Sequence, residues 1–121
     1  MKTTNGKAIK AYLTLQAMGS KQIPSTTAYR LFKLKKALLD VVEFQTEEER
    51  KLVDECGGTV TENGTIIIED AEKRKEYAAK YKELEQMECD VEFNQIKLSS
   101  AEIKEMSINE MEALEDFVNF G

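Results

Sequence analysis

Residues 26–44 read TTAYRLFKLKKALLDVVEF and contain neither glycine nor proline. Apolar side chains recur in this stretch at three- and four-residue spacing, which is the period of one face of an α-helix. One broad arc collects Ala28, Leu31, Phe32, Leu34, Leu38, Leu39, Val41 and Val42. The opposite arc collects Arg30, Lys33, Lys36 and Asp40. The stretch therefore predicts a long amphipathic helix with one buried face.

Lys35 breaks this pattern, because it projects from the middle of the apolar arc. Its aliphatic stem can run along apolar neighbours while its ammonium group reaches solvent, or it can pair with one of the many acids. A further interpretation is that the apolar face belongs partly to an oligomer interface. The residue pattern favours the first of these and leaves the others open.

The segments on either side extend the helical part. Thr46 and Glu49 have the spacing of a capping box, which restarts or continues the helix to about residue 56, and Gly57-Gly58 ends it. Upstream, Asn5 can cap a helix over about 7–18 that stops at Gly19. Apolar side chains nearly encircle that first helix, so we expect it to be well buried or to lie in an interface.

The second half of the chain mixes strand and helix signals. Asn63-Gly64 lies between β-branched runs and predicts a hairpin over 59–68. Asp70 can cap a helix over about 71–87, in which Tyr77 and Tyr81 share one face with Ala78, Leu84 and Met87 and are expected to form a core stripe. Residues 89–98 alternate with period two and change phase at 94–95, which predicts a bulged strand.

Two more capping boxes, Ser99 with Glu102 and Ser107 with Glu110, open a single turn and then a final helix over 108–118. The sequence therefore predicts one α+β domain spanning 1–121. In it, helices over about 7–18, 26–56, 71–87 and 108–118 pack on a small antiparallel sheet formed by the 59–68 hairpin and the 89–98 strand.

Composition argues against most enzyme classes. The 121 residues include no histidine, so the commonest general base and the commonest transition-metal ligand are missing. Cys56 and Cys89 are far apart in sequence and are expected to be free, buried thiols. No phosphate-binding loop is present, and the acids of residues 69–72 fit a helix N-terminus better than a metal site. We expect no enzymatic activity, no catalytic residue, no cofactor and no bound metal.

Charge is distributed unevenly along the chain, whose net charge is −6. Residues 1–39 contain eight basic residues and no acid, whereas residues 40–121 contain nine basic and 23 acidic residues. The two parts either neutralise each other in the fold, which we favour, or leave an electrostatic binding surface. The residues of such a surface, and the candidate interface, are Tyr29, Arg30, Lys33, Lys35 and Lys36.

Nucleic acid is a weaker candidate partner for this basic segment than protein is. Its lysines could follow a phosphate backbone, with Tyr29 stacking on a base, but the sequence pI is about 4.8 and no recognition motif is present. Conversely, the acidic portion could imitate a nucleic-acid backbone, although basic residues interrupt it over 73–82.

The order of these features resembles a family of small, largely uncharacterised proteins encoded by tailed phages and prophages. The resemblance covers nearly the whole chain, from the helix ending at Gly19, through residues 24–33, to the closing segment 107–117. It implies a virion or assembly component, or an accessory protein that acts on a host factor. It brings no established catalytic residue with it.

We therefore expect a non-catalytic phage or prophage protein that is structural or associated with assembly. Its partner would be a protein, either a second copy or another phage protein, and no apolar run is long enough to span a membrane. The alternative is a host-directed inhibitor that blocks a basic or nucleic-acid-binding site with its acidic surface. In both cases the expected location is the cytoplasm of the bacterial host, free or associated with virions.

Overall fold

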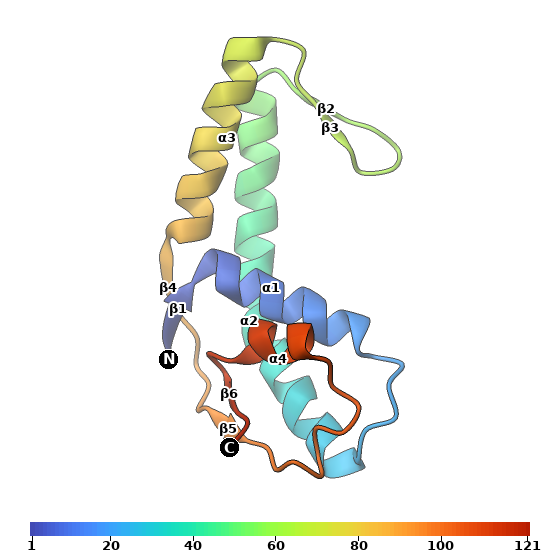
Figure 1. The fold of residues 1–121 in the computed structure, drawn as a ribbon. Coiled ribbons are helices and arrows are strands. Elements are labelled where there is room, and N and C mark those ends of the chain that lie inside the picture. Colours follow the sequence, from blue (N-terminus) through green and yellow to red (C-terminus); the bar gives the residue numbers. More distant parts are fainter.

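In the computed structural model, which describes residues 1–121, four helices are joined by very short strands. The elements in chain order are β1 (Lys2–Thr4), α1 (Asn5–Ala17), α2 (Ser25–Glu55), β2 (Thr59–Val60), β3 (Ile66–Ile67), α3 (Ala71–Gln86), β4 (Glu88–Asp90), β5 (Ile96–Lys97), α4 (Ile108–Leu114) and β6 (Val118–Asn119). The predicted α+β class is confirmed. Figure 1 shows α2 running through most of the length of the molecule, with α1 lying across it.

α2 is one uninterrupted helix of 31 residues. At 1.5 Å per residue it is about 46 Å long. The predicted capping box does not restart it, because the Thr46 hydroxyl donates to the Val42 carbonyl oxygen, 2.8 Å away within the helix. The helix continues because its inward face stays buried on both sides of this point, at Gln45 before it and at Leu52 and Val53 after it. It ends where Gly57 takes a positive φ of 67°.

The main core lies where α1 and α4 pack on the first half of α2. Thirteen buried residues form it: Ala8, Ala11, Leu15, Met18, Leu31, Leu34, Leu38, Val91, Leu98, Met106, Leu114, Phe117 and Val118. α1 contributes mainly alanines, so its backbone can approach its neighbours closely. α1 is not buried on nearly all sides, since Leu13 is 55% exposed. The alternative expectation, that this helix lies in an interface, stays a prediction.

A helical arm, formed by the second half of α2 with α3, extends beyond this core (Figure 1). Only Leu52, Cys56 and Ile68 form its buried cluster. The stacked rings of Tyr77 and Tyr81, with centroids 5.9 Å apart, pack against that cluster and are half-buried. The predicted stripe on α3 therefore packs only in part. Leu84 packs with the tyrosines, whereas the other two members, Ala78 and Met87, are exposed, because α1 and α2 cover only part of the surface of α3.

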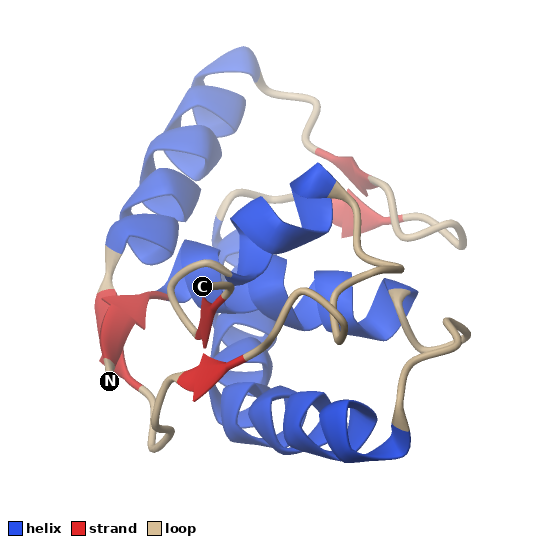
Figure 2. Ribbon diagram, turned by 60° about the horizontal axis from the view of Figure 1, so that its bottom comes forward, coloured by secondary structure: helices blue, strands red, loops and turns tan.

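The strands form three separate pairs, which Figure 2 shows at three places in the molecule. β1 pairs antiparallel with β4, β2 pairs antiparallel with β3, and β5 pairs in parallel with β6. The single sheet expected from the 59–68 hairpin and the 89–98 strand does not form. The phase change at residues 94–95 is a break between β4 and β5, because the two chain ends supply different partners to the two halves.

Local capping signals give a mixed result. The Asp70 carboxylate accepts from the backbone N–H groups of residues 72 and 73 at 2.9 and 3.1 Å, and the Ser107–Glu110 capping box is present. At α1, however, Thr4 is the cap in place of Asn5. The Asn5 side chain is 2% exposed and donates to the Gln45 side-chain oxygen at 3.3 Å.

The last helix is shorter than expected and ends at Leu114. Phe117 and Val118, predicted on its inner face, are buried in the turn and strand that follow. The carbonyl oxygen of Phe117 accepts from the Ile96 N–H at 3.1 Å, so the chain leaves the helix in order to pair with β5.

Candidate functional site

The solvent-facing side of α2, over its first half, carries two exposed aromatic rings. Tyr29 is 58% exposed and Phe32 is 53% exposed. Their three-residue spacing puts the rings side by side on the helix, where they stack with centroids 6.4 Å apart and an interplanar angle of 22°. Large rings normally provide buried area, so two stacked rings in solvent mark this side of the helix as a place where a partner can dock.

Lysines one turn further along lie over these rings. The Lys33 Nζ is 5.4 Å from the Tyr29 ring centroid, and the Lys36 Nζ is 5.8 Å from that of Phe32. Each pair has the i, i+4 spacing that places side chains next to each other on a helix. Cation–π contacts of this exposed kind contribute about 0.5–1 kcal/mol each. They hold the ammonium groups in place without neutralising them.

Lys35 lies at the border of this solvent-facing side, next to α1. Its Nζ lies 5.4 Å from the centroid of the Tyr12 ring, and the side chain is half-buried. It forms no ion pair, so the structure agrees with a stem running along apolar neighbours and not with pairing to an acid. We call Tyr29, Phe32, Lys33, Lys35 and Lys36 the aromatic–lysine face.

Arg30, the remaining candidate interface residue, does not belong to this face. Its guanidinium turns toward the C-terminal part of the chain, pairs with Glu102 and donates to the Lys97 carbonyl oxygen at 3.0 Å. The buried Thr27 hydroxyl donates to the same carboxylate at 2.6 Å. Hydrogen bonds from Thr27 and from Ser99 hold the pKa of Glu102 below its usual range. Arg30 therefore fixes the 99–105 loop against α2.

Other N-terminal cations are neutralised in the same way. Lys7 pairs with Asp116 at 3.4 Å and Lys21 with Glu110 at 2.7 Å. Five of the eight basic side chains of residues 1–39 form no ion pair: Lys2, Lys10, Lys33, Lys35 and Lys36. The sequence left two alternatives, internal neutralisation and a free basic surface. Three of the eight basic side chains follow the first, and five remain without an ion-pair partner.

An apolar groove of about 260 Å³ borders the aromatic–lysine face, between the end of α1 and the start of α2. Its lining consists of Leu15, Met18, Gly19, Lys21, Ile23, Ala28, Leu31, Phe32 and Lys35. Phe32 and Lys35 belong to both features. A ligand that fills the groove therefore also meets an exposed ring and an unpaired ammonium group.

Sequence reasoning missed the role of Phe32. It assigned Phe32, Leu39 and Ala28 to the buried arc, but Phe32 and Leu39 are 53% and 37% exposed and Ala28 is also exposed. The three lie on one edge of a very broad apolar arc, and only the middle of that arc, at Leu31, Leu34 and Leu38, is buried where α1 crosses α2 (Figure 1). The three-residue spacing of Tyr29 and Phe32, each followed four residues later by lysine, was the available signal.

The acids of the arm, by contrast, are interleaved with bases. Glu47 pairs with Arg50 at 2.6 Å, Glu48 with Lys51 at 3.4 Å, and Lys80 bridges Glu76 and Glu55 at 3.1 and 3.8 Å. A continuous row of carboxylates, as a nucleic-acid mimic needs, is absent along these helices.

The possible metal ligands, the two thiols and the apolar character of the helices complete the chemical description of the chain. No three histidine, cysteine or carboxylate side chains come close enough to hold a metal ion. Cys56 is a buried free thiol, and Cys89 is a half-buried one whose pKa is raised by burial. None of the helices combines the length and the apolar character needed to cross a bilayer.

No protein-family model matches this chain, and neither a curated protein nor a solved structure is significantly similar to it. The resemblance to phage and prophage proteins accordingly stays a prediction.

Proposed function

We propose that this chain is a non-catalytic binding protein whose aromatic–lysine face and adjoining groove dock an acidic segment of another protein. One observation carries the proposal: three lysines without an ion-pair partner lie over aromatic rings beside an apolar groove. Two of these rings, those of Tyr29 and Phe32, are exposed. The segment would place one apolar side chain in the groove and carboxylates over the lysines.

The energetics of interfaces favour such a face. Aromatic side chains dominate interface hot spots, because each buries a large area with little loss of conformational freedom. The cation–π contacts already restrict the lysine side chains. A carboxylate that binds them therefore costs less side-chain conformational entropy than binding to a freely moving lysine would. Unpaired ammonium groups also give a partner favourable electrostatic guidance toward the groove.

Protein is a better partner than nucleic acid for this face. Asp40 and Glu43 are exposed and follow Lys36 within two turns of the same helix, so the basic area is short and bounded by acids. A phosphate backbone that extended along α2 would meet these carboxylates and be repelled by them. A short peptide segment can bind the lysines without reaching Asp40 or Glu43.

The resemblance to phage and prophage proteins suggests that this partner is a structural or assembly protein of a phage. A host-directed inhibitor that uses the acidic arm is the other function implied by that resemblance. The inhibitor has less support, because lysines and arginines alternate with the carboxylates along the arm and interrupt the row of acids that would replace phosphates.

A pull-down with matched charge-reversal variants tests the proposal. The bait is the full chain, exposed to lysate of phage-producing bacteria, beside the double variants Lys33→Glu/Lys36→Glu and Lys2→Glu/Lys10→Glu. All four lysines are exposed and unpaired, but only the first pair belongs to the aromatic–lysine face. We expect the wild type and the Lys2/Lys10 variant to retain one phage protein that the face variant loses.

Three results of the pull-down would contradict the proposal. One is that the face variant captures the same protein as the wild type. Another is that the control variant loses the protein equally, which would indicate a response to net charge. The third is that nuclease treatment of the lysate abolishes capture, which would make nucleic acid the ligand.

A further inference from the structure

The end of the molecule opposite the aromatic–lysine face carries a second unpartnered surface. The β2–β3 hairpin projects there, and its Val60 and Ile67 are 59% and 45% exposed. Residues 52–72 contain six acids and no base: Asp54, Glu55, Glu62, Glu69, Asp70 and Glu72. Three bases, Lys73, Arg74 and Lys75, follow directly, and Lys80 pairs with Glu55 at 3.8 Å, so this end is acidic in balance. We call residues 52–72 the acidic hairpin end.

The hairpin is held at its base and open elsewhere. Ile68 is buried against α2, and Gly58 approaches α2 so closely that a β-carbon there would lie 3.0 Å from a methyl group of Val53. β2 and β3 pair only with each other, so both outer edges of the hairpin keep unpaired backbone groups. Isolated two-stranded hairpins are marginally stable in water, and exposed edges are sites where other chains add.

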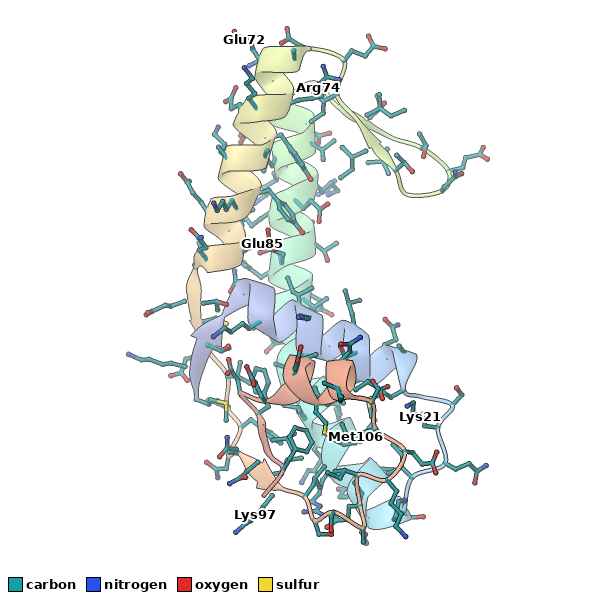
Figure 3. The ribbon with its side chains drawn as sticks, in the orientation of Figure 1. Lys21, Glu72, Arg74, Glu85, Lys97 and Met106 are labelled. Atoms are coloured by element: carbon teal, nitrogen blue, oxygen red, sulfur yellow. The ribbon has the colours of Figure 1, made fainter.

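α2 carries opposite charges at its two ends, next to the two surfaces, and this distribution does not stabilise the helix itself. α2 has basic residues and no acid in its first half, and it ends in Asp54 and Glu55 with no base in its last turn. Acids at a helix C-terminus are unfavourable, because that end of the helix dipole is negative. Figure 3 labels Glu72 and Arg74 at the end of the molecule near the hairpin and Lys21 near the opposite end.

We infer that copies of this chain associate head to tail, with the acidic hairpin end of one copy docked on the aromatic–lysine face and groove of the next. This inference rests on the proposed function and names its partner as a second copy. Charge complementarity supports it. At the acidic hairpin end, the carboxylates of Asp54, Glu55, Glu69 and Asp70 line one hollow with a single lysine, Lys73, whereas residues 1–39 lack acids. Val60 or Ile67 provides an apolar side chain of a size that fits the 260 Å³ groove.

Each molecule cannot satisfy its own two surfaces, because they lie at opposite ends of α2, which is about 46 Å long. The contact therefore joins two different patches of neighbouring copies. Contacts of this kind produce closed rings or open filaments, in contrast to the symmetric dimers that a single self-complementary patch produces. The association should weaken with added salt, because ions screen charges separated by more than a Debye length.

Complementation between two defective variants tests this arrangement. The first variant is Lys33→Glu/Lys36→Glu, which reverses charge on the face, and the second is Val60→Lys/Ile67→Lys, which removes the apolar contact and the acidic character of the hairpin. All four side chains are exposed, so both variants should fold, as circular dichroism and urea unfolding will show. Sedimentation velocity then reports the mass of each species.

We expect the wild-type average mass to rise with concentration at about 0.05 M NaCl and to fall toward the monomer at about 0.5 M. Each variant alone should remain at the 13.8 kDa monomer mass. Their mixture should form a species of twice that mass and no larger, because one intact face meets one intact hairpin and the other two sites are defective.

A wild type that is monomeric at every concentration overturns the inference. A self-associating wild type whose two variants fail to complement each other overturns it as well, since that behaviour indicates a symmetric contact. Neither result removes the proposed function, which is tested separately by the pull-down. The sedimentation experiment therefore tests whether the partner is a second copy, and the pull-down tests whether the aromatic–lysine face is the binding surface.

Discussion

Leu38 and Leu52 offer a matched test of how the arm and the main core depend on each other. Both leucines belong to α2, and both are buried, with 0% and 5% exposure. Leu38 packs in the cluster of 13 residues, whereas Leu52 packs in the cluster of three. Replacement of each by alanine removes the same atoms from two different surroundings.

The surroundings determine the expected cost. Buried Leu→Ala substitutions cost about 2–5 kcal/mol, and the larger values occur where the cavity cannot collapse. Leu38 is enclosed, so we expect about 4 kcal/mol for Leu38→Ala. Leu52 borders a groove of about 280 Å³ that Leu84 and Met87 also line, so neighbouring groups and water can fill the space. We expect about 2 kcal/mol for Leu52→Ala.

The two substitutions should also destabilise different parts of the molecule. Sub-global opening lets a weakly packed unit exchange its amides without global unfolding. Loss of about 2 kcal/mol corresponds to roughly a 30-fold increase in opening. We expect α3 amides in Leu52→Ala to exchange about 30-fold faster, with α1 amides unchanged, and Leu38→Ala to accelerate the slowest amides of α1.

Hydrogen exchange followed by NMR measures both effects, and urea unfolding supplies the global free energies. Equal acceleration of α1 and α3 amides in Leu52→Ala would refute the argument, because it would mean that the arm and the core open together. A larger global loss for Leu52→Ala than for Leu38→Ala would refute the estimate drawn from packing.

Two further predictions concern the base of the hairpin and the closing turn. Gly58→Ala places a methyl group 2.9 Å from a carbon of the Ile68 side chain, so we expect a loss of about 1–3 kcal/mol in urea unfolding, whereas Thr59→Ala, at an exposed position, should change little. At Glu110, burial raises the pKa, but hydrogen bonds from Lys21 and from Ser107 outweigh it and hold the pKa below its ordinary value of 4.5. The stabilising contribution of Glu110 is therefore present above pH 4.5 and is lost as the pH falls through the lower pKa of the folded state. We expect the urea midpoint of the wild type to fall more steeply with decreasing pH than that of Glu110→Gln. Equal slopes for the two proteins would contradict this.

Much of the local structure followed from sequence, because it depends on neighbours a few residues away. The hairpin at Asn63-Gly64, the Asp70 cap and the Ser107–Glu110 capping box are all present. Each depends on backbone groups within about four residues, so no distant contact is needed to specify it. The helical period of residues 26–44 was equally readable.

Which residues shared a surface was less predictable. Four of the five candidate interface residues belong to the aromatic–lysine face, but Arg30 turns away because Glu102 and the Lys97 carbonyl oxygen lie opposite it. Nothing near Arg30 in sequence distinguishes it from Lys33, since both carry a cation on the polar side of the same helix. The ion-pair partner comes from a loop 72 residues further along the chain.

Sequence by itself thus determined the α+β class, the hairpin turn, the helix caps at Asp70 and Ser107, and the absence of imidazole chemistry. Tertiary structure alone decided that α2 extends unbroken into an arm, that the strands pair in three separate places, and that Phe32 and Leu39 remain in solvent. The physical reason is the range of the interactions. Helix period and caps are fixed by residues within one or two turns, whereas burial and strand pairing depend on where α1, α4 and the two chain ends cross α2, and no local pattern encodes those crossings.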